Sequence, residues 1–279
     1  GTLRRDASSR FGNGNNSAIF PSVSAGWRIS RENFMETTSN WLSDLKLRAS
    51  WGINGNDMID NSATYSLYYV DMNTGSYNFS GDGKTLSPGV IKTMSGNNNL
   101  KWEQTEQFNI GIDAAFLDNR LGVTMDYFKK KTKDMLIQKP YIAAIGEGGY
   151  KWYNAASMDN NGVEATITWH DKINDFNYEV AFNVSYYHNE ITDLPEEVKY
   201  TWGGGDGISK TIIGQSYGSW MAYKTDGIFR TKEEVYEYLS KYDVQVGEPG
   251  VGRIRYKDLN GDGKINTADR DWMGSDQPK

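Results

Sequence analysis

The sequence predicts an all-β protein, namely a section of an antiparallel transmembrane β-barrel with long extracellular loops and one short helix in a loop. Three observations support this fold class: long stretches of alternating apolar and polar residues, aromatic residues at the ends of the apolar faces, and connections that alternate between short and long. Aromatic residues make up 13% of the 279 positions, and glycine occurs 30 times. This composition is typical of strands joined by polar loops.

Six stretches place an apolar side chain at every second position, as strands with one apolar face do. In one of them, Phe108, Ile110 and Ile112 alternate with polar or small residues. The stretches span residues 22–29, 45–52, 108–116, 121–128, 163–169 and 176–186. They run for 7 to 11 residues, close to the roughly nine residues that a tilted strand needs to cross a bilayer.

The predicted connections differ sharply in length. Residues 117–120 and 170–175 form tight turns, whereas residues 53–101 and 138–159 form long polar loops. Short turns at one end and long loops at the other are typical of outer-membrane barrels, and so are aromatic residues at both borders of the apolar band. Such aromatics end the apolar faces here: Trp51, Phe116, Tyr127, Trp169 and Phe176.

Two soluble alternatives stay open at this point. A secreted, calcium-stabilised β-sandwich that binds carbohydrate or mediates adhesion would show the same alternation, with its polar faces in water. A glycoside hydrolase of β architecture would need two carboxylates roughly 5–9.5 Å apart in a cleft.

Composition excludes several other classes. The chain has no cysteine, which excludes disulfide scaffolds and thiolate sites. The net charge of -6 disfavours nucleic acid as a partner. Mean hydropathy is -0.67 and no run of 18 apolar residues occurs, so the sequence predicts no membrane-spanning helix.

Six motifs resemble, in order and spacing, those of SusC/RagA-type TonB-dependent transporters. They are FPSVSAGWR at 20–28, LKLRASWG at 45–52, LKWEQT at 100–105, FNIGID at 108–113, YKTDGIF at 223–229 and YKDLNGDG at 256–263. The resemblance covers about residues 10–279. It implies a barrel of about 22 strands with an N-terminal plug domain.

The resemblance also implies a function. Family members reside in the outer membrane and import oligosaccharides or peptides with energy from TonB, together with a SusD-type surface lipoprotein, and they are not enzymes. We expect residues 17–192 to supply barrel strands and loops. We expect 193–279 to form an extracellular loop region with a helix at 231–242, which Thr231 and Glu234 cap. The plug and the segment that contacts TonB lie outside this sequence on this interpretation.

An acidic loop at residues 258–269 has the spacing of a calcium-binding loop. Its candidate ligands are Asp258, Asn260, Asp262, the Lys264 carbonyl, Asn266 and Asp269. The last position is aspartate instead of glutamate, which resembles dockerin-type loops. The alternative is an Asx-rich loop that its own hydrogen bonds hold. In either case we expect a structural role in an extracellular loop.

Aromatic residues in the predicted loops are candidate contacts for a sugar or peptide ligand. They are Tyr68, Tyr69, Tyr150, Trp152, Tyr153, Tyr200 and Trp202. Packing within the loops, or contact with the partner lipoprotein, is the alternative role. Four carboxylates in the strands, Glu103, Glu106, Asp113 and Asp126, are expected to line the polar barrel interior and not to act as catalytic acids.

Overall fold

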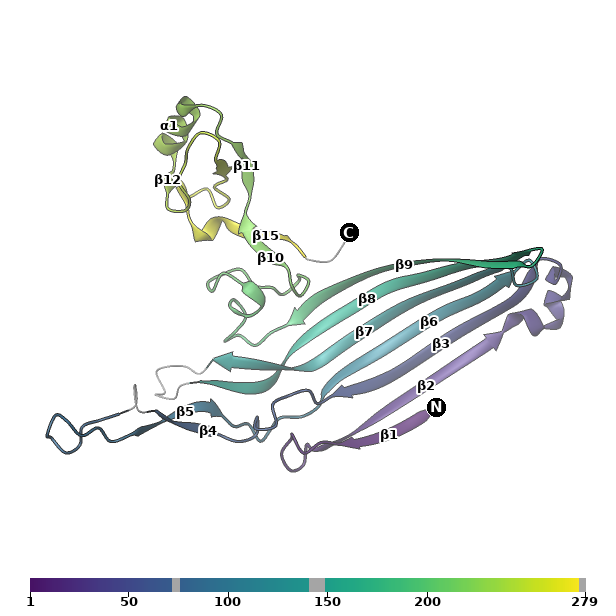
Figure 1. Ribbon diagram of the computed structural model, residues 1–279, viewed down its shortest axis with the longest axis horizontal. Helices are drawn as coiled ribbons and strands as arrows, with labels where there is room; N and C mark the ends of the chain where they lie inside the picture. Colours follow the sequence, from purple (N-terminus) through teal and green to yellow (C-terminus); the bar gives the residue numbers. More distant parts are fainter. Residues whose placement is uncertain (72–75, 141–148, 276–279) are drawn as a thin grey trace. The chain divides into compact units, whose positions relative to one another are not determined.

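The computed structural model describes residues 1–71, 76–140 and 149–275. The chain divides into two compact units, Gly1–His188 and Asn189–Lys279, and each is described by itself. The first unit contains long strands that lie side by side in one curved sheet, from purple to green in Figure 1. No helix in the described residues has the length and apolar character needed to cross a membrane.

Within the described residues, nine strands form this sheet, in the order β1-β2-β3-β6-β7-β8-β5-β4, with β9 also paired to β8. Every neighbouring pair whose register is known is antiparallel except β5 and β8, which are parallel. The strands are β1 (Thr2–Ala7), β2 (Ser17–Arg28), β3 (Leu42–Asn56), β4 (Leu67–Asp71), β5 (Gly89–Ser95), β6 (Glu103–Phe116), β7 (Leu121–Pro140), β8 (Tyr150–Ile173) and β9 (Phe176–Asp193). The predicted all-β barrel section is therefore confirmed, with three strands more than the six that periodicity identified.

Both predicted long loops contain strands. Residues 53–101 include the end of β3 and all of β4 and β5. Of residues 138–159, 138–140 lie in β7 and 150–159 lie in β8, whose ladder continues to the pair Pro140–Tyr150, and 141–148 lie outside the described residues. The reason in this second case is a β-bulge between Thr132 and Leu136, where Asp134 has φ 56°. A bulge inserts an unpaired residue, so the two-residue alternation is interrupted while the strand goes on.

The tight turns are confirmed at one position and shortened at the other. β6 ends at Phe116 and β7 begins at Leu121, so residues 117–120 form the predicted turn. The second turn contains only residues 174–175, because β8 continues to Ile173. Asn174 has φ 53°, the left-handed conformation that two-residue hairpins favour. Between β2 and β3 lie two 3₁₀ segments, η1 (Ile29–Arg31) and η2 (Asn33–Thr38).

A small core closes the loop end of the first unit. Phe11, Phe20 and Trp102 pack ring against ring, with both ring pairs 5.5 Å apart between centroids. Leu100 and Ala63 are fully buried in the same cluster. This cluster joins the segments before β2 and β6 to the loop after β3.

The second unit is built around one helix and short strand pairs. They are α1 (Lys232–Lys241), β10 (Trp220–Tyr223) with β15 (Arg270–Gly274), β11 (Thr225–Ile228) with β13 (Ile254–Tyr256), and β12 (Asp243–Val244) with β14 (Lys264–Ile265). Two 3₁₀ segments complete it, η4 (Trp202–Gly204) and η5 (Thr267–Asp269).

The predicted helix is present, and Thr231 caps it by accepting a hydrogen bond from the amide of Glu234. Val235 and Tyr238 are buried against Phe229 and Ile265, whereas Leu239 is exposed. Burial raises the pKa of Tyr238 to about 12, so its phenol stays protonated. That phenol donates a 2.6 Å hydrogen bond to a backbone carbonyl of β13.

Candidate functional site

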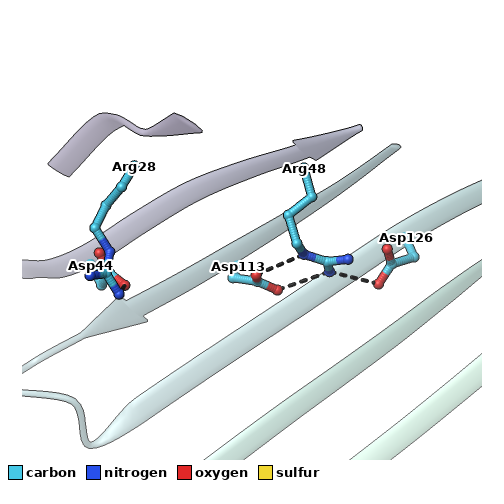
Figure 2. Close-up of polar contacts among 5 residues, drawn as sticks. All are labelled: Arg28, Asp44, Arg48, Asp113 and Asp126. Carbon is cyan, nitrogen blue, oxygen red and sulfur yellow. Dashed lines mark hydrogen bonds and ion pairs between the residues drawn. The ribbon is translucent and has the colours of Figure 1, made fainter. Parts of the chain in front are cut away.

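The polar face of the sheet carries a charged cluster on three adjacent strands. Arg48 on β3 donates two hydrogen bonds, of 2.7 and 2.9 Å, to the carboxylate of Asp113 on β6. It donates a third, of 3.0 Å, to Asp126 on β7. Figure 2 shows the guanidinium between the two carboxylates. The three charges therefore tie three strands together across the polar face.

The register explains why one arginine reaches both aspartates. Arg48 lies opposite Gly111 on β6, and Gly111 lies opposite Asp126 on β7. A Cβ atom at Gly111 would lie 2.3 Å from an Asp126 carboxylate oxygen and 2.8 Å from a guanidinium nitrogen of Arg48. Such distances are well inside van der Waals contact. The absence of a side chain at Gly111 therefore opens the path that the arginine takes over β6.

A second ion pair lies nearer the tight-turn end. Arg28 and Asp44 are 3.1 Å apart, and Ser30 donates a 2.6 Å hydrogen bond to the same carboxylate. Figure 2 shows this pair beside the Arg48 cluster. Asp113 and Asp126 serve ion pairing in this arrangement, and the polar face that holds them agrees with the prediction for these two residues.

The opposite face is apolar and exposed. By register, Ile112, Met125 and Ala165 lie in one row across β6, β7 and β8, and Ile110 and Tyr127 lie in the next. These residues are 40–54% exposed, apart from the half-buried alanine. A sandwich would bury such rows against a second sheet. The strands of the first unit form a single sheet whose apolar face is open, so they do not build a sandwich.

The prediction that Glu106 lines the polar interior is wrong. Glu106 follows the alternation of Phe108 and Ile110, so it lies on the apolar face and not in the polar interior. Its carboxylate accepts a 2.8 Å hydrogen bond from the indole of Trp51. An indole with a polar partner at the end of an apolar row is typical of the aromatic border of a membrane barrel. The Glu103 carboxylate accepts hydrogen bonds from the Asn56 side chain and from the backbone amide of Leu136 on β7.

The aromatic candidates have different surroundings. Tyr68 and Tyr69 lie on β4 and are 62% exposed, and the sheet order places β4 two strands from Tyr150 on β8. These three therefore lie at the same end of the sheet. The predicted loop position of Tyr150, Trp152 and Tyr153 is wrong, since all three lie on β8.

Two of the β8 aromatics are engaged in packing. Trp152 lies against the Phe11–Trp102 cluster, and its indole nitrogen is buried with no partner among the described residues. Tyr153 has Lys139 and Lys151 over its ring, at 4.5 and 5.5 Å from the centroid. Neither ring is an open stacking surface.

The remaining candidates, Tyr200 and Trp202, belong to a loop in the second unit. Trp202 packs on Tyr217 with ring centroids 5.7 Å apart. Asp206 organises this loop: it accepts backbone hydrogen bonds from Ile208, Ser209 and Lys210. Burial by itself raises the pKa of Asp206, but these bonds outweigh it and lower the pKa to about 2.

The acidic loop at 258–269 is held by its own hydrogen bonds. Asp258 accepts from the amides of Gly261 and Gly263, and Asp269 accepts from those of Leu259 and Asn266. Ile265, within the loop, is fully buried in the core of the second unit. Within the described ranges, no group of three or more acidic or histidine side chains is arranged to hold a metal ion.

Sequence reasoning missed two features. It did not connect Arg48 with the aspartates, because the register that aligns Arg48, Gly111 and Asp126 pairs strands far apart in the sequence. It also missed Tyr77 and Phe79, which are 66% and 81% exposed and pair at 5.9 Å between centroids. Those two sit two residues apart in a polar segment without periodicity, so no pattern marked them.

Comparison with known proteins shows which family this chain resembles in its fold and motifs. Residues 1–274 match the family described as "TonB dependent receptor-like, beta-barrel". TonB-dependent receptor P3 of Formosa agariphila is 32% identical over 99% of this chain and 27% of its own length. TonB-dependent receptor SusC of Bacteroides thetaiotaomicron is 33% identical over 96% of this chain and 26% of its own length.

Solved structures agree. The RagAB peptide importer in its "closed-closed" state has a TM-score of 0.71 at 27% identity, over 97% of this chain and 27% of that one. The RagAB peptide transporter has a TM-score of 0.67 at 32% identity, over 82% of this chain and 24% of that one. The chain thus spans about a quarter of the length of these relatives.

Proposed function

Because this chain belongs to the TonB-dependent receptor-like β-barrel family of the outer membrane, we propose that the intact protein imports oligosaccharides or peptides. The observation that carries the proposal is the family match over residues 1–274, joined to a single sheet with one apolar and one charged face. The family is one of receptors, and we propose no catalytic role for Arg48, Asp113 or Asp126.

The proposal includes two partners. TonB would supply the energy through a part of the protein outside this chain, and a SusD-type lipoprotein would act at the loop end. Support for a two-component system comes from similarity to the RagAB peptide importer. The exposed tyrosines of β4 and Tyr150 would contact the cargo or the lipoprotein.

The test is uptake by cells that carry or lack the intact receptor. Cells would be given a panel of fluorescently labelled oligosaccharides and peptides, and internal label would be measured with and without functional TonB. We expect at least one labelled cargo to enter only when receptor and TonB are both present. Equal entry into cells without the receptor, across a panel of both chemical classes, would contradict import.

We also propose that the loop at 258–269 binds calcium as a structural ion. The spacing of Asp258, Asn260 and Asp262, the glycine at 263 and the buried Ile265 support this proposal. Binding would require carboxylates to exchange some of their backbone hydrogen bonds for the ion. The loop would then gain a cross-link without a change of fold.

A further inference from the structure

β7 carries three lysines on the same face as its membrane-facing residues. Along β7, Met125 and Tyr127 are exposed on the apolar face, and the next positions of the same alternation are Lys129, Lys131 and Lys133. All three lysines are exposed, whereas Lys130, on the polar face, lies over the ring of Phe128 at 5.0 Å from its centroid. The outward row therefore changes from apolar to basic within one strand.

The change occurs at the same level on neighbouring strands. Lys129 lies opposite Phe108 on β6 and Asn161 on β8, and beyond this row the outward residues on β6 are polar. Phe108 is the last apolar residue of its row, and Glu106 and Gln104 follow. The apolar band thus ends where the lysines begin.

Strand geometry also places the lysine row at the upper border of the apolar band. Lys129 is eight residues and Lys133 is twelve residues from Leu121, which follows the tight turn. With about 3.3 Å per residue and a tilt of about 40°, the two lie about 20 and 30 Å above the turn. An apolar band is about 25 Å tall, so the row straddles its upper border.

The ammonium groups are available for a ligand. In the part of the chain that the structure describes, none of the three forms an ion pair. Acidic neighbours face only the middle lysine: Lys131 lies opposite Glu106 and Asp159, and the Glu106 carboxylate already accepts the Trp51 indole. Two exposed cations, Lys129 and Lys133, therefore face uncharged cross-strand neighbours where these are known.

We propose that Lys129, Lys131 and Lys133 bind the phosphate groups of anionic lipids in the leaflet at the loop end of the barrel. Lysine side chains extend their charge to the headgroup level while their aliphatic stems stay on apolar surface. Alternate residues on a strand lie about 7 Å apart, so the row presents three cations over about 13 Å. The inference rests on the outer-membrane location and is independent of the transported cargo.

The experiment uses the intact receptor in phosphatidylcholine nanodiscs that contain a small fraction of phosphatidic acid, with receptor-bound lipid counted by native mass spectrometry. Each lysine near an anionic surface contributes about a fivefold gain in binding. We expect K129Q/K131Q/K133Q to retain at least tenfold less phosphatidic acid at low salt, and the difference to shrink at high salt. The variant K129R/K131R/K133R should retain the lipid.

Lys130→Gln is the matched control, because it removes one charge from the same strand on the opposite face. It should leave lipid binding unchanged, and heat-modifiable gel migration checks that every variant is folded. Equal phosphatidic acid binding by the triple glutamine variant and the wild type would overturn the proposal. Displacement of the lipid from the wild type by an equal concentration of inorganic phosphate would also overturn it. A triple glutamine variant that loses lipoprotein binding but keeps lipid binding would do the same. An uptake assay on the triple glutamine variant separates loss of lipid binding from failure of import.

Discussion

Gly111 shows how one missing side chain organises a charged cluster. The Arg48 guanidinium crosses β6 at this position to reach Asp126, and no larger residue leaves room for it. We expect Gly111→Ala in the intact receptor to lower the free energy of unfolding by about 1–3 kcal/mol, because the cross-strand pairs must separate. Gly122→Ala is the control, since its Cβ would meet only atoms 3.8 Å away. Thermal denaturation of both variants measures the difference, and equal stabilities would contradict the steric argument.

At the scale of a single residue, Asp206 makes the stability of its loop depend on pH. Its pKa of about 2 in the folded loop lies below the unfolded value of about 3.9. The carboxylate therefore stabilises the loop fully above about pH 4, and this contribution is lost as the pH falls toward 2. We expect Asp206→Asn to weaken protection of the Ile208 and Lys210 amides at pH 6, as measured by hydrogen exchange. The difference from the wild type should shrink as the pH falls toward 2, and a gap that keeps its full size there would contradict the assignment.

At the scale of elements, periodicity predicted strands well where the ladder is regular and poorly where it is not. The alternation of Phe108 to Phe116 gave β6 its face and nine of its 14 residues. The bulge beside Asp134 concealed the outer half of β7 and of β8, because an extra residue inverts the pattern. The Arg48 cluster required the register of three strands, which depends on pairing between residues more than 60 positions apart. A single sequence does not contain that register.

The acidic loop gives a prediction at the same scale. We expect calcium to raise the melting temperature of the second unit within chelator-treated intact receptor, followed by the fluorescence of its tyrosines and tryptophans. At a hundredfold excess over the dissociation constant, the gain in stability is about 2.7 kcal/mol. Asp258→Asn should abolish the effect, and Asp243→Asn, outside the loop, should preserve it. Melting that ignores calcium would mean that hydrogen bonds alone hold the loop.

At the scale of the whole molecule, the two faces of the sheet meet different solvents. The chain has no cysteine, so single cysteines can report on each face. Asn183 accepts a hydrogen bond from Thr166 on the polar face, and Val184 lies on the apolar face. We expect a membrane-impermeant maleimide to label Asn183→Cys in intact cells and to leave Val184→Cys unlabelled. Reversed labelling would show that the sheet faces the membrane with its charged side.

Among the described residues, the parallel pairing of β5 with β8 consists of two residue pairs, Met94–Tyr150 and Ser95–Lys151. β7 and β8, in contrast, are paired from Leu121 to Pro140. The hairpin that presents Tyr68 and Tyr69 is thus attached to the wall of the barrel by a short seam. Few hydrogen bonds need to break for the hairpin to separate, so its opening costs far less than unfolding the wall. If the hairpin contacts cargo as we propose, its sequence can change without a change in the wall, and one scaffold can carry hairpins for different cargo.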